Sequence, residues 1–427
     1  MKKFEYPELG EVLWQGVLPN GLTVAVVPRK GFSKKLAYFV TDFGSIHREF
    51  TLEGRQIQAP AGIAHFLEHK MFDMPDGRDV SAELAALGAM VNAFTSFDMT
   101  AYYFSCTENF DAALKLLLEF VSTPYFTQES VNKEMGIIDQ EIRMNWDSPD
   151  SEVFDLLMTA LYKEHPVRVP ILGRPETIRQ ITPELLYDCQ RAFYTPGNMM
   201  LCVVGDVDPE RIAEIATQVL GSEKREVGVK QYRWTEDMLA CQDGLHKTMD
   251  VAMPTFQLGF KCEPSGKGDD AIRQEIIGDL AAEALFGESS ESYLKMYEAG
   301  IIDSSFGGGF ETIDGMAMLI CSGDSDGCGF EVRETLLEQA AKIAAEGIPE
   351  DQFLRMKRSA MGRRIRDLDS FDSTCFRLCA YKLSDFDYFR FPELYRQVQR
   401  REVEDFLHRV VRRERSGLAY IEPEEVV

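Results

Sequence analysis

Alternating apolar and polar positions predict that the chain opens with antiparallel strands. Apolar side chains recur at every second position in successive runs, at Val12 and Trp14, at Leu22, Val24 and Val26, and at Leu36, Tyr38 and Val40. The turn-forming triplet Pro19-Asn20-Gly21 separates the first two runs. A period of two, interrupted by a tight turn, is typical of strands with one face buried.

Helical periodicity follows these strands and continues through the first half of the chain. It predicts helices over 61–71, 79–87, 109–121, 128–145, 151–162, 182–193 and 209–220, with strands over 91–104 and 200–204. Pro124, Pro149 and Pro183 stand at or beside the predicted helix boundaries, where proline is tolerated because it lacks a backbone N–H.

The second half repeats the order of strands followed by helices. Residues 221–235 are charged and break the apolar periodicity, which indicates a linker. Beyond it the pattern predicts strands over 251–260 and 304–322, helices over 269–285, 329–346, 350–366, 371–384 and 403–411, and a last strand over 418–421. We therefore expect two tandem domains, 1–220 and 236–427, which suits a chain of 427 residues.

Composition excludes several kinds of partner. The net charge of −24 argues against nucleic acid and anionic membrane surfaces, which attract basic patches. No apolar run is long enough for a membrane helix, and the N-terminus lacks the apolar core of a signal peptide. The nine cysteines form no C-x-x-C pair, and their odd number suits a reducing compartment. We expect a cytoplasmic protein that contacts neither nucleic acid nor membrane.

The most informative motif is H-x-x-E-H at residues 65–69, within the helix predicted over 61–71. On a helix, His65 and His69 project from one face one turn apart. Two imidazoles so placed can bind one zinc ion. Glu68 shares that face and can act as the general base toward a metal-bound water.

A catalytic zinc ordinarily has three protein ligands, so a carboxylate is sought downstream. Glu134 and Glu141 are seven residues apart on the helix predicted over 128–145, nearly on one stripe. Ile137 and Ile138 share that stripe, which we expect to face inward. An isolated glutamate there is ordinarily a half-buried carboxylate of an amphipathic helix. The upstream motif instead favours Glu141 as the third zinc ligand and Glu134 as a supporting group.

These two motifs together resemble the insulinase (pitrilysin) family of zinc peptidases, in which H-x-x-E-H is followed at this spacing by E-x6-E. Further stretches also match, over 89–104, 165–166, 173–178, 194–199 and 204–208. The resemblance implies an α+β fold of two homologous domains, each a mixed, largely antiparallel sheet with helices on one face. It also implies Zn²⁺ as cofactor and a closed chamber around the peptide substrate.

The resemblance also suggests where substrate binds. Asn92, Ala93 and Phe94 match the family's substrate strand, which pairs with an extended peptide. Phe94 and Phe97 can equally be core residues, since one face of a strand must be buried. Cys375 and Cys379, one turn apart, are best interpreted as packing residues because no second ligand pair lies near them in sequence.

One family feature is missing from the second half. Active relatives carry an arginine and a tyrosine in a stretch like L-R-x-x-x-G-L-x-Y. Residues 293–306 match it at Gly300, but Tyr297 or a neighbour takes the arginine position and Asp303 or Ser304 the tyrosine position. Lys295 is the nearest cation, and either it or Tyr297 could stand in for the arginine; a shifted alignment is the other explanation.

We therefore expect a zinc endopeptidase that cleaves peptides or unfolded segments, for example a leader or precursor peptide. It would be the catalytic subunit of a heterodimer whose paralogous partner supplies the Arg/Tyr pair. The alternatives are a homodimeric peptidase that clears oligopeptides, a non-catalytic assembly subunit and a metal-dependent peptide-binding module. Intact catalytic positions argue against the assembly role.

Overall fold

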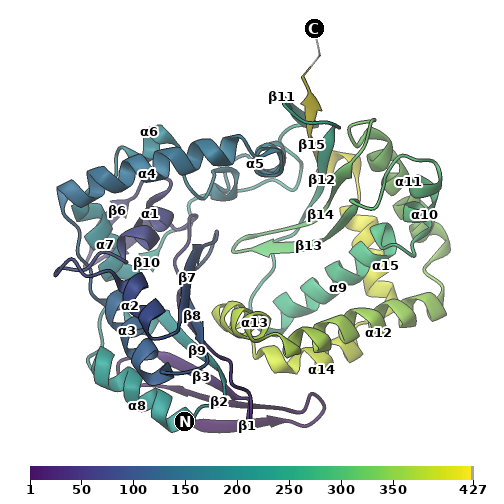
Figure 1. Ribbon diagram of the computed structural model, residues 1–427. Helices are drawn as coiled ribbons and strands as arrows, with labels where there is room; N and C mark the ends of the chain where they lie inside the picture. The colour runs from purple at the N-terminus through teal and green to yellow at the C-terminus, as the bar shows by residue number, and fades with distance from the viewer. Residues whose placement is uncertain (425–427) are drawn as a thin grey trace.

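The computed structural model describes residues 1–424 as two α+β halves that lie side by side (Figure 1). Each half is built on one large, mostly antiparallel sheet with helices packed against it. The predicted mixed α+β class with two similar units is confirmed. None of the described helices is both long enough and apolar enough to cross a membrane.

A seven-stranded sheet organises the first half. Its strand order is β1 (Lys2–Tyr6), β2 (Glu11–Val17), β3 (Thr23–Pro28), β9 (Met199–Gly205), β4 (Lys35–Thr41), β8 (Thr100–Cys106) and β7 (Met90–Thr95). All neighbours are antiparallel except β3 and β9. Since β7 is the edge strand, its outer backbone groups are free to pair with another chain.

A small sheet extends the first half toward the linker. It has the order β10 (Val229–Lys230), β5 (Glu49–Leu52) and β6 (Arg55–Gln58). Because β10 lies inside the segment predicted as a linker, that segment runs back along the first half instead of crossing directly to the second. The β5–β6 hairpin itself was not predicted.

The second half contains a five-stranded sheet. Its order is β11 (Gly244–Met249), β15 (Ser416–Pro423), β12 (Thr255–Cys262), β14 (Met316–Asp324) and β13 (Gly307–Ile313). Only β11 and β15 are parallel. The glycine-rich strand β13 forms one edge.

The helices largely follow the predicted ranges. Those of the first half are α1 (Ile63–Lys70), α2 (Val80–Ala86), α3 (Phe110–Ser122), α4 (Gln128–Trp146), α5 (Pro149–Leu161), α6 (Pro175–Ile178), α7 (Pro183–Phe193) and α8 (Pro209–Leu220). Those of the second are α9 (Gly268–Phe286), α10 (Glu291–Glu298), α11 (Phe330–Glu346), α12 (Glu350–Arg366), α13 (Phe371–Leu383), α14 (Phe391–Gln397) and α15 (Arg400–Val410). The short helices α6, α10 and α14 and the strands β1 and β11 were not predicted.

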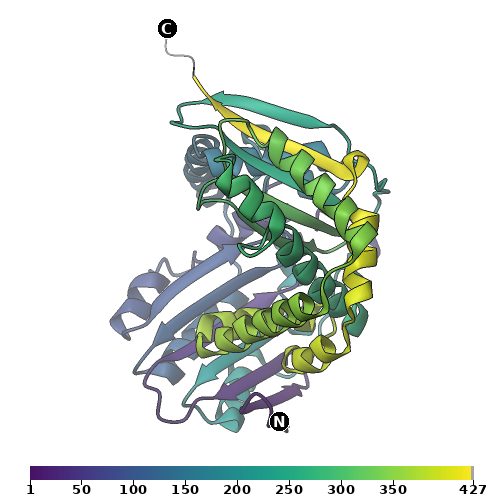
Figure 2. The same cartoon turned by 90° about the vertical axis from the view of Figure 1, so that its right-hand side faces the viewer.

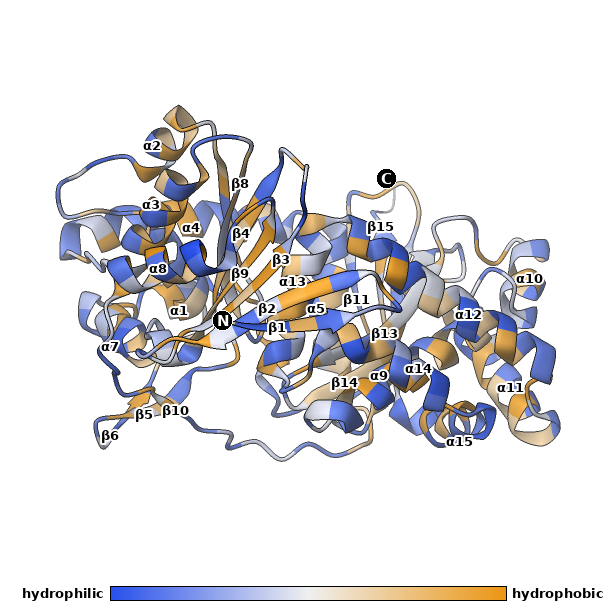
Figure 3. Ribbon diagram, turned by 90° about the horizontal axis from the view of Figure 1, so that it is seen from below, coloured by the Kyte–Doolittle hydropathy of each residue, from blue (hydrophilic) through white to orange (hydrophobic). Residues whose placement is uncertain are grey.

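The two halves exchange helices, which the simple tandem pattern does not reveal. Helix α5 of the first half packs on β11, β12 and β15 of the second sheet. Gly259 and Gly417 permit this approach, since a Cβ at either position would lie 2.7 or 3.1 Å from Leu161 side-chain atoms. In return α13 lies across β4 and β9 of the first sheet (Figure 2). The central strands β3, β4 and β9 are therefore buried on both faces and strongly apolar (Figure 3).

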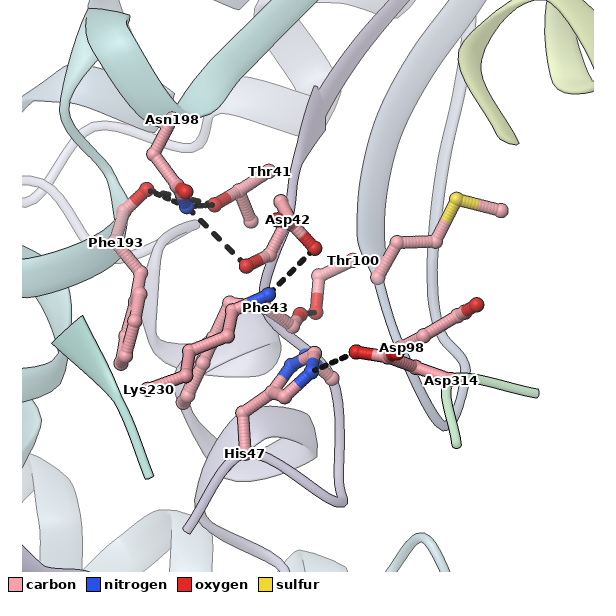
Figure 4. Close-up of polar contacts among 12 residues, drawn as sticks. Thr41, Asp42, Phe43, His47, Asp98, Thr100, Phe193, Asn198, Lys230 and Asp314 are labelled. Carbon is pink, nitrogen blue, oxygen red and sulfur yellow. Dashed lines mark hydrogen bonds and ion pairs between the residues drawn. The ribbon is translucent and has the colours of Figure 1, made fainter. Parts of the chain in front are cut away.

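A polar cluster ties the turn between β13 and β14 to the first half (Figure 4). The Asp314 carboxylate lies 3.7 Å from the Nε2 atom of His47 and accepts a hydrogen bond from the Tyr232 hydroxyl. The Asp314 carbonyl oxygen lies 3.1 Å from Nε2 of His165. Burial is the main cause that lowers the pKa of His47. Both histidines are therefore structural groups at the junction, and Lys230 adds an ion pair to Asp42 at 2.6 Å.

Candidate active site

The helix that carries H-x-x-E-H begins where two glycines allow two loops to meet. Gly62 precedes α1 with φ 91°, a conformation that L side chains rarely adopt. A Cβ on Gly62 would lie 2.5 Å from the Leu172 carbonyl oxygen, and one on Gly173 would lie 2.5 Å from the Ala61 carbonyl oxygen. The loop before α6 is thus packed directly on the start of α1, which fixes the position of the two histidines.

Helix α4 brings the carboxylates to α1. Thr127 and Ser130 form a capping box at its start, and its buried stripe is Val131, Ile138 and Ile142. The expectation that Ile137 also faces inward is wrong, because this residue is 46% exposed. At 100° per residue, position 137 lies about 100–140° around the helix from each of the buried positions 131, 138 and 142.

The structure brings His65, His69 and Glu141 into one group whose ligand atoms all lie within 4.8 Å of one another. The Nε2 atoms of His65 and His69 lie 3.5 and 3.6 Å from the two Glu141 carboxylate oxygens. The hydrogen bond with His65 is the main cause that lowers the pKa of the Glu141 carboxyl. Two imidazole nitrogens and one carboxylate form a donor set that suits zinc and leaves one position open.

Glu134 orients the second histidine. Its Oε1 atom lies 2.9 Å from Nδ1 of His69. The Nε2 atom of that ring is thereby left to face His65 and Glu141, which with His69 form what we call the metal group. Burial alone would raise the pKa of the Glu134 carboxyl. The hydrogen bond and charge of His69, with the nearby Lys70, outweigh burial and hold this pKa below its usual value. Lys70 is itself buried and paired with Asp73, a contact that the sequence pattern did not reveal.

Glu68 sits in a buried position beside the metal group. Its exposed fraction is only 7%, and burial is the main cause that raises the pKa of its carboxyl. The Thr95 hydroxyl donates a hydrogen bond to its Oε2 atom at 2.6 Å and opposes that rise. A buried carboxyl group with a raised pKa suits a general base that later returns its proton.

The predicted substrate residues lie on the edge strand β7. Asn92 is exposed, and its Oδ1 accepts a hydrogen bond from the Ala93 N–H at 2.9 Å. Ala93 packs against the core of the first half. The Phe94 ring is half-buried and lies 6.1 Å from the Phe376 ring of α13. A packing role for Phe94 is thus visible, while substrate contact by these three residues stays a prediction.

The stretch at 293–306, where the arginine and tyrosine are missing, forms α10 and the turn after it. Lys295 is exposed and pairs with Glu338 of α11 at 3.1 Å, so its ammonium group already has a partner. Tyr297 is 52% exposed and stacks on Tyr293. Gly300, at the matched glycine position, has φ 69°.

Other candidate ligands do not assemble into a site. Within residues 1–424 the His65–His69–Glu141 group is the one set of three metal-binding side chains. Cys375 and Cys379 are fully buried between α13 and β9, in keeping with packing. His246, with its side chain 56% exposed, contacts Tyr420 and Glu422 at the surface.

Family models match most of the chain. Residues 57–174 match the model described as insulinase (peptidase family M16), and residues 180–360 match the peptidase M16 inactive domain. The second description agrees with the absence of H-x-x-E-H from the second half.

Individual relatives agree with these models. A Bacillus subtilis protein named uncharacterized zinc protease YmfH is 36% identical over 99% of both chains. A second B. subtilis protein, named zinc protease YmxG, is 26% identical over 74% of this chain and 76% of its own. The mitochondrial-processing peptidase subunit beta of Caenorhabditis elegans is 29% identical over 48% of this chain and 44% of its own.

Solved structures show the same architecture. An M16-like peptidase from Alicyclobacillus acidocaldarius superposes with a TM-score of 0.93 at 31% identity, covering 99% of this chain and all of the other. A Helicobacter pylori protease shares the fold with a TM-score of 0.82 at 19% identity, covering 96% and 99% of the two chains. With a relative more than 30% identical over nearly its whole length, and with both family models in sequence order, this chain belongs to peptidase family M16, the insulinase family.

Proposed function

We propose that the protein is a zinc-dependent endopeptidase with His65, His69 and Glu141 as its metal ligands. The observation that carries this proposal is the convergence of these three side chains from α1 and α4, with Glu68 buried beside them. Bound zinc would polarise the scissile carbonyl and lower the pKa of water toward neutrality. The relatives named zinc proteases support the same function.

The protein's own groups then have defined roles. Glu68 accepts a proton from the attacking water and later passes it to the leaving nitrogen. Glu134 holds the His69 ring through Nδ1, so that its Nε2 atom stays directed at the metal group. The edge strand β7 offers backbone groups to an extended peptide, and Asn92, Ala93 and Phe94 are the residues we assign to this contact.

Pairing along a strand edge requires a substrate with a free, extended backbone. We expect the enzyme to cleave unfolded segments and peptides, such as a leader or precursor peptide, and to spare folded domains. The measurement compares cleavage of a stable folded domain with that of a peptide from the same domain. Efficient cleavage of the folded form would contradict a substrate chamber that admits only extended chains.

A heterodimer is the assembly that we propose. The stretch at 293–306 lacks the arginine and tyrosine, and Lys295 is engaged with Glu338 on the surface. One relative is by its name a subunit of a processing peptidase. We therefore assign the missing arginine and tyrosine to a paralogous subunit, with a self-paired homodimer as the runner-up. Hydrogen-bond donors that stabilise the developing oxyanion raise the rate about 10²–10³-fold.

The chain assayed alone and with its paralogue tests this assembly. We expect the zinc-loaded chain alone to cleave a quenched peptide at least about 10²-fold more slowly than the mixture. A paralogue whose arginine is replaced by alanine should give no stimulation. Full turnover by the isolated chain, at concentrations where it is a monomer, would contradict the proposal and favour a different source for the donors.

We also propose a division of the chain into a catalytic domain (1–220), a linker (221–235) and a second domain (236–427). The large sheets support this division, because strands β1–β4 and β7–β9 precede the linker and β11–β15 follow it. All nine cysteines are free thiols, which fits the reducing cytoplasm that we propose as its location.

A further inference from the structure

The side chain of Thr95 makes one contact that the reaction scheme above does not use. Its Oγ1 atom lies 2.6 Å from Oε2 of Glu68, the proposed general base. An ionised carboxylate only accepts hydrogen bonds, so the hydroxyl must be the donor. A hydrogen bond to a charged acceptor is about twice as strong as a neutral one.

Within residues 1–424, Glu68 is the side chain that accepts a hydrogen bond from the Thr95 hydroxyl. The Thr100 hydroxyl lies 3.5 Å away on the neighbouring strand. Thr100 donates its own proton to the Phe43 carbonyl oxygen at 2.8 Å (Figure 4), so it serves Thr95 at most as a distant neighbour. The hydroxyl proton of Thr95 is therefore available for the hydrogen bond to the Glu68 carboxylate.

The backbone around Thr95 is firmly held. Thr95 is the last residue of β7 and pairs with Thr100 on β8. The turn that follows accepts hydrogen bonds from the 45–46 backbone, through the Ser96 carbonyl oxygen at 3.1 Å and the Phe97 carbonyl oxygen at 3.0 Å. A hydroxyl fixed on such a hairpin can hold a neighbouring carboxylate in one rotamer.

We propose that Thr95 is a positioning residue that fixes the Glu68 carboxylate for proton transfer. This inference rests on the proposed peptidase function and deepens it. Thr95 occupies Oε2, and Glu68 has no other side-chain hydrogen bond within residues 1–424. Oε1 is then the atom that takes the proton from water and returns it to the leaving nitrogen. Because Thr95 ends the substrate strand, one short segment aligns both the peptide and the base.

Two substitutions separate this role from packing. Thr95→Val keeps the shape but removes the donor, whereas Thr95→Ser keeps the donor. In the assembly in which the wild type is active, we expect Thr95→Val to lower kcat roughly 10- to 100-fold with KM within about 2-fold. Thr95→Ser should stay within about 3-fold of the wild-type kcat. Zinc content should match the wild type in both.

A matched control is Thr23→Val on β3, a half-buried strand threonine outside the site, which should leave both constants unchanged. The inference is overturned if Thr95→Val keeps kcat within about 2-fold, or if Thr95→Ser falls as far as Thr95→Val. A rise in KM with unchanged kcat would also overturn it and assign Thr95 to substrate binding. If instead the wild type is inactive in every assembly, the proposed function fails and this role fails with it.

Discussion

Replacing Glu68 by glutamine should abolish peptide hydrolysis while zinc stays bound. Glutamine keeps the size of the side chain and still accepts the Thr95 hydrogen bond, but it cannot take a proton from water. The loss of a positioned general base costs at least about 10²-fold in kcat. Steady-state cleavage of a quenched peptide, together with metal analysis of the same sample, measures both effects.

Glu129→Gln is a suitable control for this experiment, since Glu129 is exposed in the first turn of α4 and outside the metal group. It should retain full activity. A Glu68→Gln variant that hydrolyses peptide at the wild-type rate would remove Glu68 from the mechanism.

Replacing Glu141 by glutamine should release the metal. This substitution removes the one anionic member of the His65–His69–Glu141 group and leaves two neutral imidazoles, fewer than the three ligands of a catalytic zinc. We expect substoichiometric zinc after dialysis, and activity that falls with the metal content. Glu134→Gln should be milder, with an affinity loss of about 10- to 100-fold, because Glu134 acts only through His69.

Zinc content by elemental analysis and zinc affinity by competition with a chromophoric chelator distinguish the two variants. The order of affinity should be wild type, then Glu134→Gln, then Glu141→Gln. Full zinc content and full activity in Glu141→Gln would show that the third ligand has been misassigned.

The candidate site could be predicted from sequence because its members lie on two helices with local spacing rules. His65 and His69 are one turn apart, and Glu134 and Glu141 are two turns apart, so each pair shares a face whatever the rest of the fold does. Family resemblance then supplied the pairing of the two helices. The prediction that Ile137 faces inward was wrong, because the spacing of apolar residues identifies the buried face of a helix only to within part of a turn.

What the sequence could not predict depends on contacts between distant segments. The exchange of α5 and α13 between the two sheets cannot be predicted from helical periodicity, which does not say on which sheet a helix packs; Gly259 and Gly417 only make room for α5. The hydrogen bond from Thr95 to Glu68 joins a strand to a helix 27 positions away in the sequence. Hydroxyl-to-carboxylate contacts of this kind follow from the three-dimensional arrangement alone.

An anomalous difference map at the zinc absorption edge, from crystals of the protein purified with zinc, would show directly whether His65, His69 and Glu141 bind the metal. We expect one strong peak per chain, enclosed by the Nε2 atoms of His65 and His69 and the Glu141 carboxylate. Data from a Glu141→Gln crystal should show that peak weakened or lost. A wild-type map without a peak at this position, or with its zinc bound elsewhere, would contradict the proposed metal centre and the peptidase mechanism built on it.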